Sequence, residues 1–322
     1  MWDGRIMRIE KVGILGGSGF VGSHLAALLE QGGYQVRVLT RRRAHAVHLT
    51  LLPRVEVVEC NVHDRASLQQ ALLGCDAVIN LVGILHESRA MSFERAHVEL
   101  PRSVASVCRE LGVPRLLHMS ALQAGPQAPS AYLRSKAAGE AAVLETAGGS
   151  VHTTFFRPSV IFGRGDSFLN LFASLVRSLP LLLLAKPEAR FQPVFVGDVA
   201  RAFVSSLENP DTYGQAYGLC GPQVYSLRQL VNYVMQLLGL RRPVIGLNDR
   251  LSYLQAYAME LLPVKLMTRD NLRSMQVDSV CECAFPAVFG FAPTALEAVA
   301  PAYLADEEPR THYLRFRGRA GR

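Results

Sequence analysis

Short apolar runs alternate with amphipathic stretches through the first half of the chain. Six runs have the length of strands and are largely apolar at consecutive positions: residues 10–15, 35–40, 55–60, 77–82, 115–120 and 153–157. The amphipathic stretches between them predict helices, among them 23–31, 92–111 and 130–146. Continuous apolar strands indicate a sheet that is covered on both faces. The repeated strand–helix–strand order therefore predicts an α/β fold with a doubly wound parallel sheet, a Rossmann domain.

After residue 162 the pattern becomes helix-rich and less regular. Helices are predicted at 168–179, 198–208, 227–238, 251–262 and 269–275, and a short strand at 192–196. We expect a nucleotide-binding domain at 9–160 plus about 192–218, a smaller helix-rich lobe at 161–191 and 219–304, and a flexible basic tail at 305–322. Asp198 lies at the start of a predicted helix and is expected to cap it.

A glycine-rich turn links the first predicted strand to the first predicted helix, with Gly16, Gly19 and Gly22 three residues apart. In such a unit the first glycine permits the turn and the second lets backbone N–H groups approach a pyrophosphate. The third lets the helix pack closely on the sheet. A helix N-terminus also favours an anion. The turn predicts a dinucleotide site formed by Gly16, Ser18, Gly19, Phe20, Val21 and Gly22; an ordinary turn of any α/β protein is the other interpretation.

Arginines follow the second predicted strand at positions 41, 42 and 43, and no acidic residue occurs between Glu30 and Glu56. An acidic side chain near this place binds the ribose 2′-OH of NAD, whereas a basic one accommodates the 2′-phosphate of NADP. Arg41 and Arg42 therefore favour NADP(H) as the cofactor, with NAD(H) as the alternative. An ordinary basic loop is the other interpretation of these arginines.

Tyr132 and Lys136 lie four residues apart in a predicted helix, so both project from the same face. A neighbouring ammonium group and a cationic nicotinamide would both favour the phenolate, which is expected to lower the pKa of Tyr132. Tyr132 then becomes a candidate acid/base, and Lys136 a ligand of the nicotinamide ribose.

Residues at other predicted strand ends complete the expected cofactor path. Asn61 and Val62 follow the third strand, where adenine contacts are expected, and Pro158 closes the sixth. Leu81, Val82 and Gly83 close the fourth strand. Each could equally be part of an ordinary turn at the end of its strand.

Composition narrows the classes of partner. The 322 residues carry a net charge of +7, and the last fourteen contribute Arg310, Arg315, Arg317, Arg319 and Arg322 without an acid. A solvated terminus is the simpler explanation of this tail, and contact with anionic lipid or an acidic protein is the alternative. No DNA-binding motif accompanies it, so nucleic acid is not expected as a partner.

Six cysteines are scattered, and no Cys-x-x-Cys or histidine cluster occurs, so neither a disulfide framework nor a metal site is predicted. A reducing compartment fits this pattern. Residues 1–11 lack the apolar region of a signal peptide, and the longest apolar stretch, 179–185, is too short to span a bilayer. We therefore expect a cytoplasmic protein that is at most peripheral to the inner membrane.

The motifs together resemble the short-chain dehydrogenase/reductase superfamily, in the extended or atypical branch that includes NAD(P)-dependent epimerases and dehydratases. The glycine turn, the Tyr-x-x-x-Lys pair and the segments 157–163 and 193–200 match in order. Segments 132–140, 161–170 and 293–299 resemble, more specifically, the nucleotide-binding accessory subunit family of respiratory complex I (NADH:ubiquinone oxidoreductase) and its bacterial relatives. The resemblance extends over nearly all of residues 9–304.

In one respect the chain departs from this family. Extended members place a catalytic Ser or Thr two residues into the segment after the fifth strand, where this chain reads Ser120-Ala121-Leu122-Gln123. Ser120 is then the remaining candidate for that role. Without a second hydrogen-bond donor, a substrate carbonyl is less polarised as charge develops on it.

Two functions follow from the resemblance and the motifs. The first is an oxidoreductase or epimerase-like enzyme, in which Tyr132, Lys136 and Ser120 assist hydride transfer with an apolar substrate related to a quinone or a lipid. The alternative is a non-catalytic NADPH-binding accessory or assembly factor for respiratory complex I or quinone metabolism. The alternative implies contact with a respiratory complex or a membrane surface.

Overall fold

The centre of the molecule is a seven-stranded parallel sheet. The structure, a computed structural model, describes residues 8–261 and 266–305. The strands run in the order β11-β6-β5-β4-β1-β2-β3, and each neighbouring pair is parallel. Their bounds are β1 (Lys11–Leu15), β2 (Gln35–Thr40), β3 (Val55–Glu59), β4 (Ala77–Asn80), β5 (Arg115–Met119), β6 (His152–Pro158) and β11 (Ala216–Leu219). This order confirms the Rossmann fold, with one further strand beside β6.

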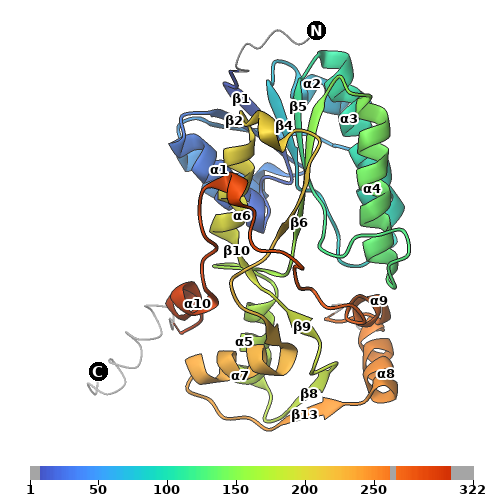
Figure 1. Cartoon of the computed structure of the whole chain (residues 1–322), viewed down its shortest axis with the longest axis vertical. Coiled ribbons are helices and arrows are strands. Elements are labelled where there is room, and N and C mark those ends of the chain that lie inside the picture. The colour runs from blue at the N-terminus through green and yellow to red at the C-terminus, as the bar shows by residue number, and fades with distance from the viewer. Residues whose placement is uncertain (1–7, 262–265, 306–322) are drawn as a thin grey trace, which may run out of the picture.

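Helices cover both faces of the sheet (Figure 1). One face packs against α1 (Phe20–Gln31) and α6 (Val196–Ser206), and the other against α2 (Arg65–Leu72), α3 (Leu100–Leu111) and α4 (Ala131–Ala147). Because side chains alternate along a strand, neighbours in β1 enter different cores: Ile14 joins the α1 side and Leu15 the α2–α3 side. The central strands β1 and β4 are therefore apolar at nearly every position, whereas the outer strands β2 and β3 also carry charged residues.

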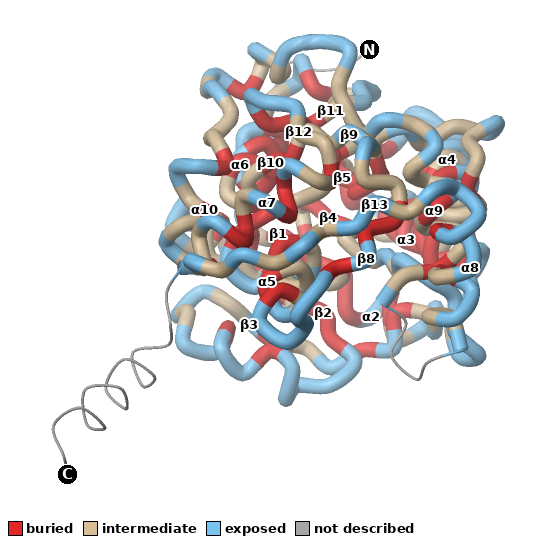
Figure 2. Tube along the Cα trace, turned by 90° about the horizontal axis from the view of Figure 1, so that it is seen from below, coloured by how far each residue is buried: buried red, intermediate tan, exposed pale blue. Residues whose placement is uncertain are grey.

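The remaining elements form a helix-rich lobe at the other end of the molecule (Figure 1). Three two-stranded sheets pair β7 (Ile161–Phe162) with β10 (Val194–Phe195), β9 (Arg190–Phe191) with β12 (Tyr225–Ser226), and β8 (Leu182–Ala185) with β13 (Val244–Leu247). The lobe's helices are α5 (Leu169–Ser178), α7 (Leu227–Leu237), α8 (Asp249–Glu260), α9 (Arg269–Ser274) and α10 (Leu296–Leu304). In Figure 2 the buried residues of this lobe, in red, lie toward the interior, and exposed segments, in pale blue, surround them. The domain boundaries expected from the sequence stay a prediction, and residues 306–322 of the expected tail lie outside the described residues.

Several local predictions are corrected by the structure. The helix predicted at 92–111 contains a π-helical turn, η2 (Arg95–Glu99), before α3. The 3₁₀-helices η1 (Arg43–Leu51), η3 (Pro210–Thr212) and η4 (Ala287–Phe289), like α10, were not predicted. Asp198 does not cap α6, because it lies in the helix's first turn and its carboxylate accepts bonds from Thr294 N and Oγ1 at 2.6 and 3.1 Å.

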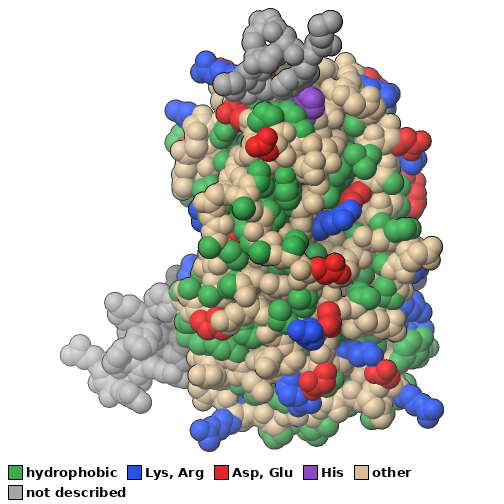
Figure 3. Space-filling model, in the orientation of Figure 1, with side chains coloured by type: hydrophobic (Ala, Val, Ile, Leu, Met, Phe, Trp, Pro, Cys, Tyr) green, Lys and Arg blue, Asp and Glu red, His purple; other side chains and the backbone are tan. Residues whose placement is uncertain are grey.

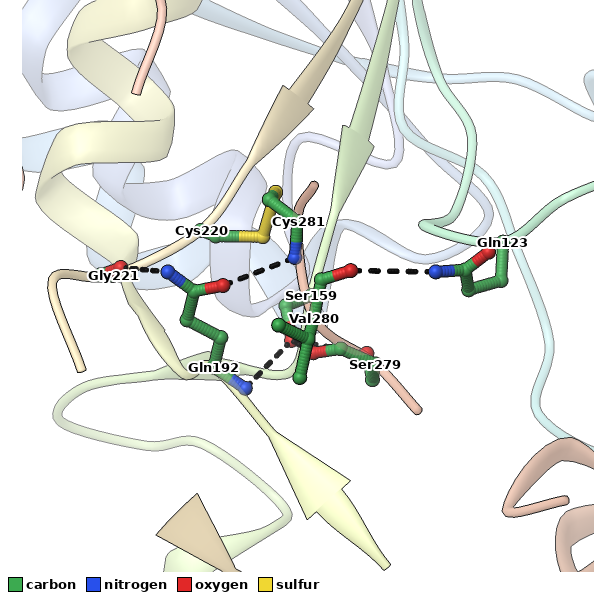
Figure 4. Close-up of a disulfide and its surroundings, with 8 residues drawn as sticks. All are labelled: Gln123, Ser159, Gln192, Cys220, Gly221, Ser279, Val280 and Cys281. Carbon is green, nitrogen blue, oxygen red and sulfur yellow. Dashed lines mark hydrogen bonds between the residues drawn. A yellow bond between two sulfur atoms is a disulfide. The ribbon is translucent and has the colours of Figure 1, made fainter. Parts of the chain in front are cut away.

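The expectation that the chain has no disulfide is wrong for one pair of cysteines. Cys220, just after β11, is bonded to Cys281 in the segment that follows α9, across 61 residues of sequence (Figure 4). The other cysteines, Cys60, Cys75, Cys108 and Cys283, are free thiols. Sequence spacing could not show the pair, because only the folded chain brings β11 and the 279–283 segment together.

A fully buried arginine joins the sheet to the chain beyond α6. The Arg115 guanidinium donates to the carbonyl oxygens of His152, Ser206 and Leu207 and to the hydroxyls of Thr154 and Thr212. It also lies 4.6 Å from the centre of the Tyr213 ring. Its burial lowers the pKa of Arg115 to about 10, so it stays protonated at neutral pH.

Replacing this guanidinium should destabilise the fold strongly. Arg115→Met leaves several buried acceptors without a donor, so we expect the free energy of unfolding to fall by about 3 kcal/mol or more. Urea denaturation measures the loss. Arg109→Met is the matched control, since its guanidinium bonds the Thr146 carbonyl at the surface; equal losses in the two variants would contradict the assignment.

Candidate functional site

The glycine turn places the N-terminus of α1 directly against the end of β1. Gly16 has φ +78°, which favours glycine. A Cβ on Gly22 would lie 2.4 Å from the Gly16 carbonyl oxygen, so only glycine permits this approach of helix and turn. Gly19 precedes the helix, no side chain caps it, and the first turn holds no acidic residue. The backbone N–H groups there are thus available to a pyrophosphate, and the helix dipole favours its charge.

The end of β2 brings two exposed arginines next to this turn. Thr40 Oγ1 donates to the Arg42 carbonyl oxygen at 3.1 Å and lies 3.3 Å from Ser18 Oγ. Arg43 bonds elsewhere, because its guanidinium donates to the Val57 carbonyl oxygen. Arg41 and Arg42 are exposed and form no ion pair within the described chain. The backbone of Arg42 is thus linked through Thr40 to Ser18 of the glycine turn.

The segment after β4 connects the glycine turn with Lys136. A Cβ on Gly16 would lie 3.2 Å from the Leu81 carbonyl carbon, and one on Gly83 would lie 3.1 Å from Lys136 Nζ. Val82 N donates to Asn80 Oδ1, which fixes the turn between them. The predicted residues Gly16, Leu81, Val82, Gly83 and Lys136 therefore form one continuous edge.

The remaining predicted cofactor residues lie farther along the carboxyl edge of the sheet. Asn61 and Val62 follow β3, where Asn61 Oδ1 accepts a bond from His63 N and Val62 packs into the core. Pro158 ends β6, and its carbonyl oxygen accepts a bond from Leu122 N at 3.0 Å. Among the described residues no hydrogen bond joins these three to the glycine turn, so their cofactor roles stay predictions.

The candidate catalytic residues meet between α4 and the end of β5. Lys136 is buried, and its Nζ donates to the Met119 carbonyl oxygen at 3.1 Å. Ser120 follows Met119, and its buried Oγ has no hydrogen-bond partner in the part of the chain that the structure describes. Tyr132 packs edge-on against Phe93 and His97. A buried hydroxyl without a partner is costly, which points to a ligand at Ser120.

Helix α9 of the second lobe fixes the start of α4. The carboxylate of Asp270 accepts bonds from the backbone N–H groups of Ala131 and Tyr132 at 2.9 and 3.0 Å. Ser274 Oγ donates to Ser130 Oγ, the N-cap of α4. A residue of the other lobe therefore holds the turn of helix that carries Tyr132. Sequence patterns gave no sign of this contact across 138 residues.

His97 is a member of the site that the sequence reasoning missed. It lies in the π-helical turn η2, and its Nε2 accepts a bond from Ile84 N at 3.0 Å. With Nε2 as acceptor, Nδ1 carries the proton and donates to Ser135 Oγ, which donates to the Tyr132 carbonyl oxygen. The sequence shows only a histidine inside a predicted helix, because the π-helical turn, a feature often found at functional sites, becomes visible only in the structure.

Burial dominates the protonation of this cluster. It lowers the pKa of Lys136 to about 8, against the attraction of Glu140, and lowers that of His97 to about 3 with help from the Lys136 charge. Burial raises the pKa of Tyr132 to about 12. Loss of water around the phenol opposes the expected lowering of that pKa, which stays a prediction for the chain with a nicotinamide bound.

Leu122 does not supply the hydrogen-bond donor found in extended family members. A Cβ on Gly218 would lie 3.5 Å from Leu122 Cδ1 and 3.2 Å from Cys281 Sγ, so Leu122 packs beside the disulfide. The neighbouring segment is fixed by Gln123 Nε2, which donates to the Val280 carbonyl oxygen, and by Gln192 Oε1, which accepts from Cys281 N (Figure 4). Residues 279–281 thus lie beside Leu122 and Gln123, in the segment that follows Ser120.

The arrangement suits a dinucleotide that runs from the α1 N-terminus past Leu81–Gly83 to Lys136. Three features fit such a ligand: the uncapped helix start, the approach that only Gly22 permits, and the unpartnered Ser120 hydroxyl.

No group of three or more His, Cys, Asp or Glu residues able to hold a metal occurs among the described residues. Within those residues, likewise, no helix has the length and apolarity needed to cross a bilayer.

Comparison with known proteins agrees with this geometry. Residues 12–220 match the NAD dependent epimerase/dehydratase family. The mitochondrial NADH dehydrogenase (ubiquinone) 1 alpha subcomplex subunit 9 of Mus musculus is 35% identical over 227 residues, 69% of this chain and 59% of that protein. The chain therefore spans about three fifths of that subunit. A ceramide reductase of Caulobacter vibrioides is 32% identical over 201 residues, 62% of this chain and 61% of that protein.

Solved structures show the same fold at lower identity. The UDP-glucose 4-epimerase of Thermotoga maritima superposes with a TM-score of 0.71 at 16% identity, covering 92% of this chain and 96% of the epimerase. The resemblance to extended short-chain dehydrogenases and to the complex I subunit is thus confirmed. The chain belongs to the NAD dependent epimerase/dehydratase family.

Proposed function

We propose that the chain binds NADP(H) along the carboxyl edge of its sheet and reduces or oxidises an apolar carbonyl or alcohol there. The observation that carries this proposal is the continuous edge from the glycine turn through Leu81–Gly83 to the buried Lys136 ammonium. The proposed cofactor ligands are Gly16, Ser18, Gly19, Phe20, Val21, Gly22, Arg41, Arg42, Asn61, Val62, Leu81, Val82, Gly83, Tyr132, Lys136 and Pro158. The cofactor, when bound, would supply or accept a hydride.

Tyr132 would hold the proton that the substrate oxygen gains on reduction. With a pKa of about 12 the phenol is protonated at neutral pH, which suits a proton donor better than a base. The Lys136 ammonium would stabilise the phenolate that forms as the proton leaves. Ser120 Oγ would donate a hydrogen bond to the same oxygen, because that hydroxyl is buried and has no other partner within the described residues.

The composition of the second lobe favours an apolar substrate, such as a lipid or a quinone. Its core includes Phe162 at the end of β7 and, in the segment and helix that follow, Phe168, Leu169 and Phe172. A relative that is 32% identical over 201 residues is named a ceramide reductase, and ceramide is a lipid. Such a substrate would enter between the carboxyl edge of the sheet and this lobe.

A second function is favoured by Leu122 and by the relatives. Leu122 replaces the donor that extended members use, and the mouse relative is named as a subunit of a respiratory NADH dehydrogenase. The chain would then keep the dinucleotide as a structural ligand and act as an accessory or assembly factor for complex I or quinone metabolism. Its partners would be a respiratory complex and the inner-membrane surface, with the protein on the cytoplasmic side.

The two arginines after β2 should set cofactor preference. Arg41→Ala combined with Arg42→Ala removes charge-assisted bonds to a 2′-phosphate, so NADPH affinity should fall by about tenfold to a hundredfold while NADH affinity stays within about threefold. Fluorescence titration measures both. Arg102→Ala, an exposed arginine of α3, is the control and should change neither affinity. Tighter binding of NADH than NADPH by the unaltered protein would refute the preference.

Tyr132→Phe separates the enzyme from the accessory protein. If Tyr132 transfers the proton, NADPH oxidation with long-chain ketones or quinones should slow by about a hundredfold or more, a far larger change than any loss of NADPH affinity. Tyr233→Phe in α7 is the control and should retain full turnover. Bound NADPH that no such substrate oxidises, even with the unaltered protein, would favour the structural ligand.

The affinity for NADPH should depend on the proton of Lys136. Its pKa of about 8 means that the ammonium is present below that pH and lost above it. Affinity should therefore fall as the pH rises through about 8, measured from about pH 7 to 9.5. Lys136→Arg, charged over that whole range, should show no such fall. A constant affinity in the unaltered protein would show that the ammonium does not contact the cofactor.

A further inference from the structure

Helix α8 exposes its large apolar side chains and buries its small ones. The buried residues are Ser252 and Ala256. Leu254 and Leu261 are 61% and 73% exposed, and Leu251 is also exposed. These leucines recur at intervals of three and seven residues, so they form one stripe that faces away from the protein. A helix with this pattern is normally covered by an apolar surface.

The exposed stripe continues onto the sheet beside α8. Leu183 of β8 and Ile245 of β13 are register partners, and both side chains are exposed. Gln255 Nε2 donates to the Leu183 carbonyl oxygen at 3.0 Å, which holds α8 along the edge of β8. We call this surface the α8 face; its members are Leu183, Ile245, Leu251, Tyr253, Leu254, Tyr257 and Leu261.

Exposed apolar side chains concentrate at this end of the molecule. Of the sixteen large apolar residues most exposed in the described chain, ten lie within residues 179–183 and 245–266. Figure 1 places β8, β13 and α8 together at the end opposite the Rossmann sheet, where Figure 3 shows green side chains beside both blue and red ones. A concentration of this kind marks an interaction surface.

The charges around the α8 face are positive on balance. Both acids of α8 are neutralised, Asp249 by Lys186 at 2.8 Å and Glu260 by Arg269 at 2.9 Å. Arg250 is exposed and forms no ion pair within the described residues. Arg241 and Arg242, just before β13, line a hollow of about 510 Å³ together with Asn232 and Gln236. Uncompensated cations therefore lie on α8 itself, at Arg250, and just before the strand that carries the exposed Ile245, at Arg241 and Arg242.

We propose that the α8 face docks on an anionic lipid bilayer. Leucines would enter the acyl boundary, Tyr253 and Tyr257 would lie at the headgroup level, and the arginines would contact lipid phosphates. The hollow beside Arg241 and Arg242 has room for a headgroup. A second copy of the chain fits less well, because a twofold contact across this face would bring the same uncompensated arginines together.

Vesicle co-sedimentation of the full chain tests the proposal. Vesicles of phosphatidylcholine with phosphatidylglycerol should bind the protein at least about tenfold more strongly than phosphatidylcholine alone. Leu254→Gln with Leu261→Gln should weaken binding to the anionic vesicles about tenfold or more, and Leu144→Gln, an exposed leucine of α4, should not. Arg241→Gln with Arg242→Gln should weaken only the anionic preference, with Arg102→Gln as its control.

Three results would overturn the proposal. One is equal binding to the two kinds of vesicle, and another is unchanged binding by the leucine variant when deletion of residues 306–322 abolishes it. The third is a dimer in sedimentation velocity that the leucine variant converts to a monomer. NADPH titration and thermal melting of every variant show that folding and the proposed cofactor site are intact, so the outcome is independent of the proposed function.

Discussion

The candidate site depends on one buried positive charge. Lys136 holds its ammonium against the Met119 carbonyl oxygen at the end of β5, and burial, assisted by this charge, lowers the pKa of both His97 and His118. Both histidines therefore stay neutral, and His97 can accept a bond from Ile84 N while it donates to Ser135. The countercharge is held one helical turn away, where Glu140 pairs with Arg157 of β6. Protonating either histidine would put two cations in one low-dielectric space.

The sheet and the glycine turn could be predicted because their signals are local. A strand that is covered on both faces is apolar throughout, and the interval between Gly16 and Gly22 is set by one turn and the first turns of a helix. Contacts between distant segments left no such pattern. Cys220 with Cys281, Asp198 with Thr294 and Asp270 with the start of α4 are separated by 61, 96 and about 139 residues. Each contact exists because the second lobe folds back onto the first.

The sequence could place Tyr132 and Lys136 together, although it gave no account of the electrostatics around them. Spacing placed Tyr132 and Lys136 four residues apart on one face of a predicted helix, and both residues lie in α4. Spacing says nothing of how much water the fold removes, and that desolvation raises the pKa of Tyr132. The same limit hid His97, whose role depends on a π-helical turn and on the hydroxyl of Ser135.

The second lobe connects the proposed membrane face to the proposed catalytic tyrosine. Glu260 at the end of α8 accepts bonds from the backbone N–H and the guanidinium of Arg269, the first residue of α9. The next residue, Asp270, holds the backbone N–H of Tyr132. Docking of α8 on a bilayer would therefore be connected, through these hydrogen bonds, to α9 and to the start of α4. An apolar substrate dissolved in that bilayer would meet the lobe that positions Tyr132, so the docking surface and the preference for an apolar substrate support one another.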